Sequence, residues 1–224
     1  MMKRRLSAIT AGALALGLFL VSAPRGFASG RHLVEVTITN MTRGQILSPP
    51  VVATHTGRAA PLFAVGEPAS PALAALAEDA AAGDLLDQLD LDPATVDVEM
   101  AAGPILPGGS ATLFLEARHA RYFSALAMLV TTNDAFIAVN RSGLPRHSGS
   151  FYSVAYDAGS EANNESCDFI PGPPCDHPHV RDLAGAEGYV HVHAGVHGIA
   201  DLVPADHDWR NPVARIVVRR VRTD

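Results

Sequence analysis

The sequence lacks the short motifs that mark the common hydrolases and nucleotide-binding enzymes. It contains no Gly-Xaa-Ser-Xaa-Gly elbow, no His-Glu-Xaa-Xaa-His zinc motif and no glycine-rich phosphate loop. The nearest hydrolase-like fragment is Ser148-Gly149-Ser150 beside His147, and a polar turn explains it more simply. We therefore expect a binding or structural protein and not an enzyme.

Basic side chains are scarce beyond the N-terminal segment. The chain has 17 Lys and Arg against 23 Asp and Glu, and residues 1–28 contain four of the basic residues and none of the acidic ones. Loss of that segment leaves 13 basic against 23 acidic side chains, a net charge of about −10. Because such a surface repels phosphate groups, we expect no nucleic-acid partner. Carboxylate oxygens suit hard cations such as Ca²⁺ better.

The apolar run near the N-terminus, residues 8–21, is shorter than the ~20 residues that a transmembrane helix needs. Lys3, Arg4 and Arg5 precede it, and Ala28 ends a stretch with small residues at the positions that an export peptidase recognises. This layout is typical of a secretory signal peptide. We predict a signal peptide at residues 1–28 and a secreted or periplasmic protein with no transmembrane segment after cleavage.

Cysteine is rare, and its two occurrences are close together. Cys167 and Cys175 lie eight residues apart. In an oxidising compartment such a pair forms a disulfide, and two free thiols are the alternative. A loop this short limits the stabilisation to roughly 2–3 kcal/mol. The disulfide is therefore expected to fix a loop and not to hold the fold together.

The remaining ~196 residues are enough for one well-packed core, and no repeat or low-complexity linker divides them. Val34, Val36 and Ile38 alternate with polar residues, which indicates a strand with one buried face. Comparable segments bounded by turn residues predict strands at residues 33–40, 51–55, 95–100, 111–117, 122–130, 135–139, 151–156, 188–193 and 213–221. Eight or nine short strands favour an antiparallel β-sandwich, in one domain of residues 29–224.

One segment has helical character. Leucines recur at roughly helical spacing over residues 71–89, Pro71 suits a helix start, and Gly83 is expected to break or bend the pattern. We predict one short helical insertion there, as a single helix or as two helical turns. Residues 157–188 form a long loop, and loops of that length usually indicate function or disorder.

Three acidic residues lie close to the ends of predicted strands. Asp134 occupies a tight break between two apolar strands, Asp157 directly follows a strand, and Glu161 comes four residues later. Carboxylates on adjacent loops of a sandwich can converge on Ca²⁺, which takes six to eight oxygen ligands. Asn163 and Asn164 could add neutral oxygens. The alternative is that these are ordinary turn and capping residues.

Four short sequence segments, two of which contain these acids, occur in a characteristic order along the chain. They are residues 36–42 (VTITNMT), 128–139 (MLVTTNDAFIAV), 156–161 (YDAGSE) and 208–216 (DWRNPVARI). In this order they resemble elements of the spondin N-terminal domain, in particular its bacterial members. The resemblance runs from about His32 to the C-terminus and so covers nearly all of the expected mature chain.

That resemblance implies a β-sandwich similar to a C2 domain, with one calcium ion at one end of the sheets. The family's acidic ligands fall on Asp134, Asp157 and Glu161, the last of which is often Asp in animal members. Ala135 stands where the family usually has an aromatic residue, a departure that affects local packing and removes no ligand. Animal members act in extracellular matrix and cell adhesion, which implies an extracellular or cell-envelope polymer or protein as partner.

Histidines form a second candidate site. His191 and His193 share one face of a predicted strand, and His197 follows closely. Paired imidazoles with a third nearby are typical ligands of zinc or copper. The competing interpretation is a set of surface and turn histidines, because no carboxylate or cysteine stands at a fixed spacing from them. An exported zinc- or copper-binding metalloprotein is therefore the alternative function.

Overall fold

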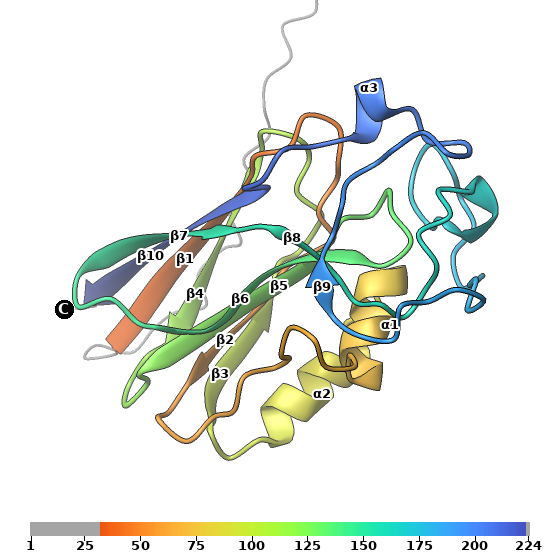
Figure 1. Ribbon diagram of the computed structural model, residues 1–224. Helices are drawn as coiled ribbons and strands as arrows, with labels where there is room; N and C mark the ends of the chain where they lie inside the picture. The colour runs from red at the N-terminus through yellow and green to blue at the C-terminus, as the bar shows by residue number, and fades with distance from the viewer. Residues whose placement is uncertain (1–31, 223–224) are drawn as a thin grey trace, which may run out of the picture.

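A computed structural model describes residues 32–222, and the expected signal peptide lies outside these described residues. The strands form two antiparallel sheets (Figure 1). The four-stranded sheet has the order β4-β1-β10-β7, made of β4 Ser110–Glu116, β1 His32–Asn40, β10 Ala214–Arg222 and β7 Ser148–Ser153. The six-stranded sheet has the order β3-β2-β5-β6-β8-β9, made of β3 Thr95–Met100, β2 Val51–His55, β5 Tyr122–Met128, β6 Ala135–Gly143, β8 Ala155–Asp157 and β9 His191–Val192. The predicted β-sandwich is confirmed.

The space between the sheets holds the main hydrophobic core. Val34, Val36 and Ile38 of β1 are fully buried there, as the alternation in the sequence predicts. Phe123 of β5 and Ile137 of β6 belong to the same cluster from the opposite sheet. The two sheets are therefore joined by side chains that point inward from both, as in other aligned sandwiches.

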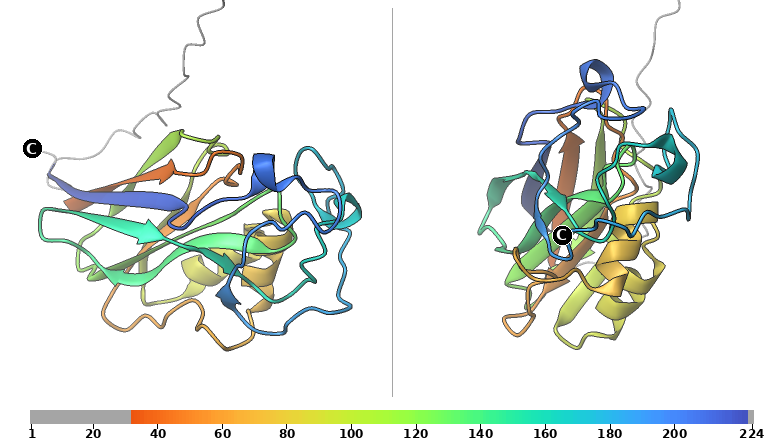
Figure 2. Two further views of the ribbon diagram at one scale, coloured as in Figure 1. Left: turned by 45° about the horizontal axis from the view of Figure 1, so that its top comes forward. Right: turned by 45° about the vertical axis from the view of Figure 1, so that its right-hand side comes forward.

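Two helices cover the outer face of the six-stranded sheet (Figures 1 and 2). They are α1 (Pro71–Asp79) and α2 (Gly83–Leu91), and their leucines form a second cluster with Val51, Leu126 and Phe136. Strands β2 and β5 are therefore covered on both faces, which explains why every residue of β2 and all but Tyr122 of β5 are buried, with no alternation.

The helical insertion differs in detail from the prediction. It is two helices, because Ala80 adopts a left-handed conformation that ends α1, and Gly83 begins α2. Two further short helical elements were not predicted: the 3-10 turn Cys167–Phe169 and the four-residue α3 (Pro204–His207). No helix among residues 32–222 is both long and apolar enough to cross a membrane.

The strand predicted at residues 151–156 is in fact two strands in different sheets. β7 pairs with β10, whereas β8 pairs with β6, so the chain passes from one sheet to the other at Val154. Asn211 stabilises this crossing, because its side-chain oxygen accepts a hydrogen bond from the Ala155 N–H (2.9 Å). The crossing places Asp157, the last residue of β8, at one end of the six-stranded sheet.

The long segment between β8 and β9 is fixed to the domain at several points. The predicted Cys167–Cys175 disulfide is present in it. Arg181 reaches the end of α1. Its Nε lies 2.5 Å from Glu78 Oε2, and its Nη2 lies 2.8 Å from Asp79 Oδ2. The backbone N–H of His179 also donates to Asp79 (2.8 Å). Residues 158–190 are thus an ordered cover beside the helices.

The helix-facing core gives a test of the fold. Phe136 is fully buried, and its ring centroid lies 5.3 Å from that of Phe63 and 5.6 Å from that of Tyr156. We expect Phe136→Ala to lower the free energy of unfolding by about 3–5 kcal/mol, because it leaves a cavity under the helices. The matched control, Leu91→Ala at an 81% exposed position, should change it by less than about 0.5 kcal/mol. Urea unfolding measures both, and equal effects would contradict this packing.

Candidate metal centre

Strand pairing gathers the candidate site residues at one end of the six-stranded sheet. In the register, Ala135 lies opposite Asp157, and Asp157 lies opposite His191. Asp134 immediately precedes β6 and therefore lies beside the end of β8. The site is thus built from the start of β6, the end of β8 and the start of β9.

Asp134 connects this sheet end to the first residues of the long loop. Its side chain is fully buried. Its Oδ2 accepts hydrogen bonds from the backbone N–H groups of Ser160 (2.7 Å) and Glu161 (3.0 Å) and from the Ser160 hydroxyl (3.2 Å). Its Oδ1 is buried and has no hydrogen-bond partner among the described residues. One oxygen of Asp134 therefore holds the loop, and the other is left available.

Asp157 is equally buried and is held through both oxygens. Its Oδ1 accepts a hydrogen bond from the Gly159 N–H (2.7 Å), and its Oδ2 accepts one from Asn163 Nδ2 (2.6 Å). Gly159 has a φ of +65°, and a Cβ there would lie 2.3 Å from the carbonyl oxygen of Tyr189. Only glycine allows the chain to turn this closely against the opposite loop.

Burial of two neighbouring carboxyls changes their acidity. Burial, and then the charge of Asp157, raises the pKa of Asp134 to about 7. Burial raises the pKa of Asp157 to about 6, against hydrogen bonds from Asn163 and Gly159 that lower it. A protonated Asp134 can also donate to Asp157. Near neutral pH the pair therefore needs a shared proton or a cation to balance its charge.

Glu161 is brought to the same region with its carboxylate in a different environment. Its backbone N–H donates to Asp134, but its Oε1 accepts a hydrogen bond from the Asp182 N–H (3.1 Å). Burial, and then the charges of Glu78 and Asp134, raises the pKa of Glu161 to about 8. The charges of the three acids predicted as calcium ligands are thus linked through Asp134, which also accepts the Glu161 N–H.

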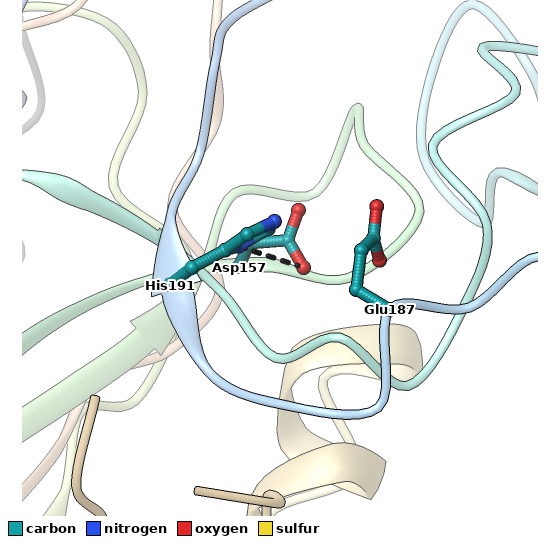
Figure 3. A group of neighbouring side chains, drawn as sticks. All are labelled: Asp157, Glu187 and His191. Atoms are coloured by element: carbon teal, nitrogen blue, oxygen red, sulfur yellow. Dashed lines mark ion pairs between the residues drawn. The ribbon is translucent and has the colours of Figure 1, made fainter. Parts of the chain in front are cut away.

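The tightest group of metal-ligating side chains in residues 32–222 is Asp157, Glu187 and His191 (Figure 3). Each offers one ligand atom, and these three atoms lie within 4.8 Å of one another. Glu187 was missed in the sequence because 29 loop residues separate it from Asp157. The sequence signal that could have identified Glu187 is local: it is an acid four residues before a histidine that begins a strand.

The three predicted histidine ligands have different roles. His193 is buried, and its Nδ1 accepts the Gly195 N–H (2.9 Å), so its Nε2 carries the hydrogen that is donated to Asn163 Oδ1 (2.9 Å). Burial, and then the charges of His191 and His197, lowers the pKa of His193 to about 4. Both of its ring nitrogens are engaged, so it holds Asn163 and is not available to a metal. Of the three histidines, only His191 belongs to the group with Asp157 and Glu187.

A second buried glutamate shapes the wall opposite the carboxylates. Glu165 accepts three backbone hydrogen bonds, from His197 (2.6 Å), Gly198 (2.7 Å) and Ile199 (3.0 Å). This fixes the segment that follows β9. The segment and the carboxylates enclose a cavity of about 170 Å³, whose lining includes Asp157, Asn163, Glu187, His191, His193 and His197.

Comparisons with known proteins add no family to this description. No family model matches the chain, and a search of curated proteins finds no significant match. The resemblance to the spondin N-terminal domain therefore stays a prediction that rests on the sequence strings.

The raised carboxyl pKa values predict how stability depends on pH without metal. A carboxyl whose pKa is higher in the folded state stabilises the fold while protonated, and this stabilisation is lost as pH rises through the folded value. His193 has the opposite effect, because its lowered pKa of about 4 makes stability rise up to about pH 6.5. Above that, only the acids contribute.

We therefore expect the metal-free protein to unfold at a lower temperature at pH 8 than at pH 6.5. Asp134→Asn keeps an oxygen that can accept the loop N–H groups and removes the charge, so it should reduce this difference. Differential scanning calorimetry of metal-free protein measures it. An unfolding temperature that rises from pH 6.5 to 8 would contradict the raised pKa values of these buried carboxyls.

Proposed function

We propose that this chain is an exported β-sandwich domain that binds one Ca²⁺ ion beside Asp134, Asp157 and Glu161. The observation that carries the proposal is the buried Asp134 Oδ1, which accepts no hydrogen bond from the described residues. An unpaired buried carboxylate oxygen is costly, and a cation ligand would remove that cost.

The charge of the site supports a cation. Asp134 forms no ion pair with a basic side chain of residues 32–222, and its nearest strong electrostatic neighbours are acids. Arg181, whose charge lowers the pKa of Glu161, is already paired with Glu78 and Asp79. A divalent ion would supply the missing positive charge, and oxygen-rich surroundings favour Ca²⁺.

Calcium would act by ordering the loop. The oxygen of Asp134 that faces Ser160 and Glu161 already positions the start of residues 158–190. An ion on the other oxygen would hold the carboxylate ionised in this orientation, which strengthens hydrogen bonds from backbone N–H groups. The same ion would relieve the repulsion between Asp134 and Asp157.

The ordered loops offer a surface for a partner. Six large apolar side chains of residues 180–203 are exposed: Val180, Leu183, Tyr189, Val192, Ile199 and Val203. Together with the resemblance to the spondin N-terminal domain, they support an adhesion, matrix or cell-envelope binding role. The disulfide and the predicted signal peptide support export from the cytoplasm.

Thermal unfolding of residues 29–224 tests the calcium site. Binding to the folded state alone stabilises it by about 2.7 kcal/mol at a hundredfold excess of Ca²⁺ over the dissociation constant. We expect the unfolding midpoint to rise with Ca²⁺ relative to chelator, and the rise to disappear in Asp134→Asn. Asp176→Asn, which alters an exposed acid of the same loop, is the matched control. A folded wild-type protein with no Ca²⁺ response would refute the proposal.

A further inference from the structure

A mixed group of carboxylates and imidazole lies on the β9 side of Asp157. Figure 3 shows the Asp157 carboxylate extending toward Glu187 and the His191 ring lying next to Asp157. His191 Nδ1 lies 3.6 Å from Asp157 Oδ1, too far for a hydrogen bond. The residues come from the end of β8, the loop before β9 and the first position of β9, so three separate backbone segments present them to one point.

Two of the atoms at this point have no partner. Glu187 Oε2 and His191 Nδ1 are both buried, and neither is hydrogen-bonded within residues 32–222. An ionised carboxylate and the bare nitrogen of a neutral imidazole both offer lone pairs and no proton. Because buried polar atoms are almost always satisfied, such acceptors around one point favour a shared cation.

The opposite oxygens of the two carboxylates are held by one amide. Asn163 Nδ2 donates to Asp157 Oδ2 (2.6 Å) and to Glu187 Oε1 (3.2 Å). The amide cannot flip, because its oxygen accepts the His193 Nε2–H and the other nitrogen of His193 is fixed by Gly195. This chain of hydrogen bonds leaves Glu187 Oε2 without a hydrogen-bond partner. It resembles the hydrogen bonds that orient the ligands of metal sites from behind.

From this geometry we propose that Asp157, Glu187 and His191 form a binding site for a first-row transition ion such as Zn²⁺, with a coordination position open to the adjacent cavity. One imidazole and two carboxylates are suitable ligands for Zn²⁺, whereas Ca²⁺ prefers oxygen alone. Three protein ligands leave a fourth position for water or a small ligand, as in zinc sites that exchange ligands. The proposal does not rest on calcium binding.

The spacing fits after a small movement. Zinc bonds of about 2.0–2.2 Å place neighbouring ligand atoms of a tetrahedron roughly 3.3–3.6 Å apart. Asp157 and His191 already satisfy this at 3.6 Å. From the 4.8 Å limit of the group to a spacing of about 3.3–3.6 Å, Glu187 would need to close by at most about 1.2–1.5 Å, and its loop side chain is only half-buried.

Calorimetric titration of the metal-free, tag-free residues 29–224 with Zn²⁺ tests this site. We expect one Zn²⁺ per chain, and affinity at least tenfold weaker in Glu187→Gln and in His191→Asn. The matched control is His197→Asn, which alters another histidine of the same cavity that is outside the three-residue group. Its Zn²⁺ affinity should stay within about twofold of wild type. Circular dichroism confirms that each variant is folded.

Two results would overturn the site: no Zn²⁺ binding by folded wild-type protein, or equal affinity in His191→Asn and wild type. Calcium stabilisation, measured on the same variants, separates the two proposals. Glu187→Gln and His191→Asn should keep it, whereas Asp134→Asn should lose it and still bind Zn²⁺. Co²⁺ as a spectroscopic probe gives a second readout, since tetrahedral coordination in wild type should produce intense visible absorption that His191→Asn loses.

Discussion

The burial of Asp134 and Asp157 side by side is the constraint on which the rest of this sheet end depends. Burial raises the pKa of both carboxyls, the charge of Asp157 raises that of Asp134 further, and the surrounding structure is arranged to satisfy them. Backbone N–H groups of the loop hold one oxygen of Asp134, and the Asn163 amide holds one oxygen of Asp157. The same interactions set the path of residues 158–190, so the loop's conformation and the protonation or metal binding of the pair are linked.

The sandwich was predictable from local patterns, but its strand exchange was not. Alternation in β1 and the apolar runs of β2, β5 and β6 directly reflect burial on one face or on two. The change of sheet at Val154 is accompanied by a hydrogen bond to Asn211, a residue that no local pattern around β7 indicates. The sequence left open whether the insertion is one helix or two helical turns, because the left-handed alanine at Ala80 that ends α1 has no sequence signal.

The site, like the fold, was only partly predictable from the sequence. Asp134 and Asp157 are recognisable as acids at strand ends, and antiparallel pairing of β6 with β8 then makes them neighbours. Of the histidine cluster, His191 lies beside Asp157 and Glu187, whereas contacts with Asn163 and Gly195 engage both ring nitrogens of His193, which no sequence pattern indicates. Glu187 needed the three-dimensional structure, since its place depends on the register between β8 and β9.

The most direct test of a cation on this buried pair is the count of protons released when Ca²⁺ binds at pH 7. With the Asp134 pKa at about 7, a substantial fraction of metal-free molecules carries a proton on the pair, and an incoming cation must displace it. Calorimetry in two buffers of different ionisation enthalpy measures this count. The account predicts that a clear fraction of a proton or more is released per Ca²⁺, because Glu161, with a pKa of about 8, also carries a proton at pH 7. Calcium binding without proton release would contradict it.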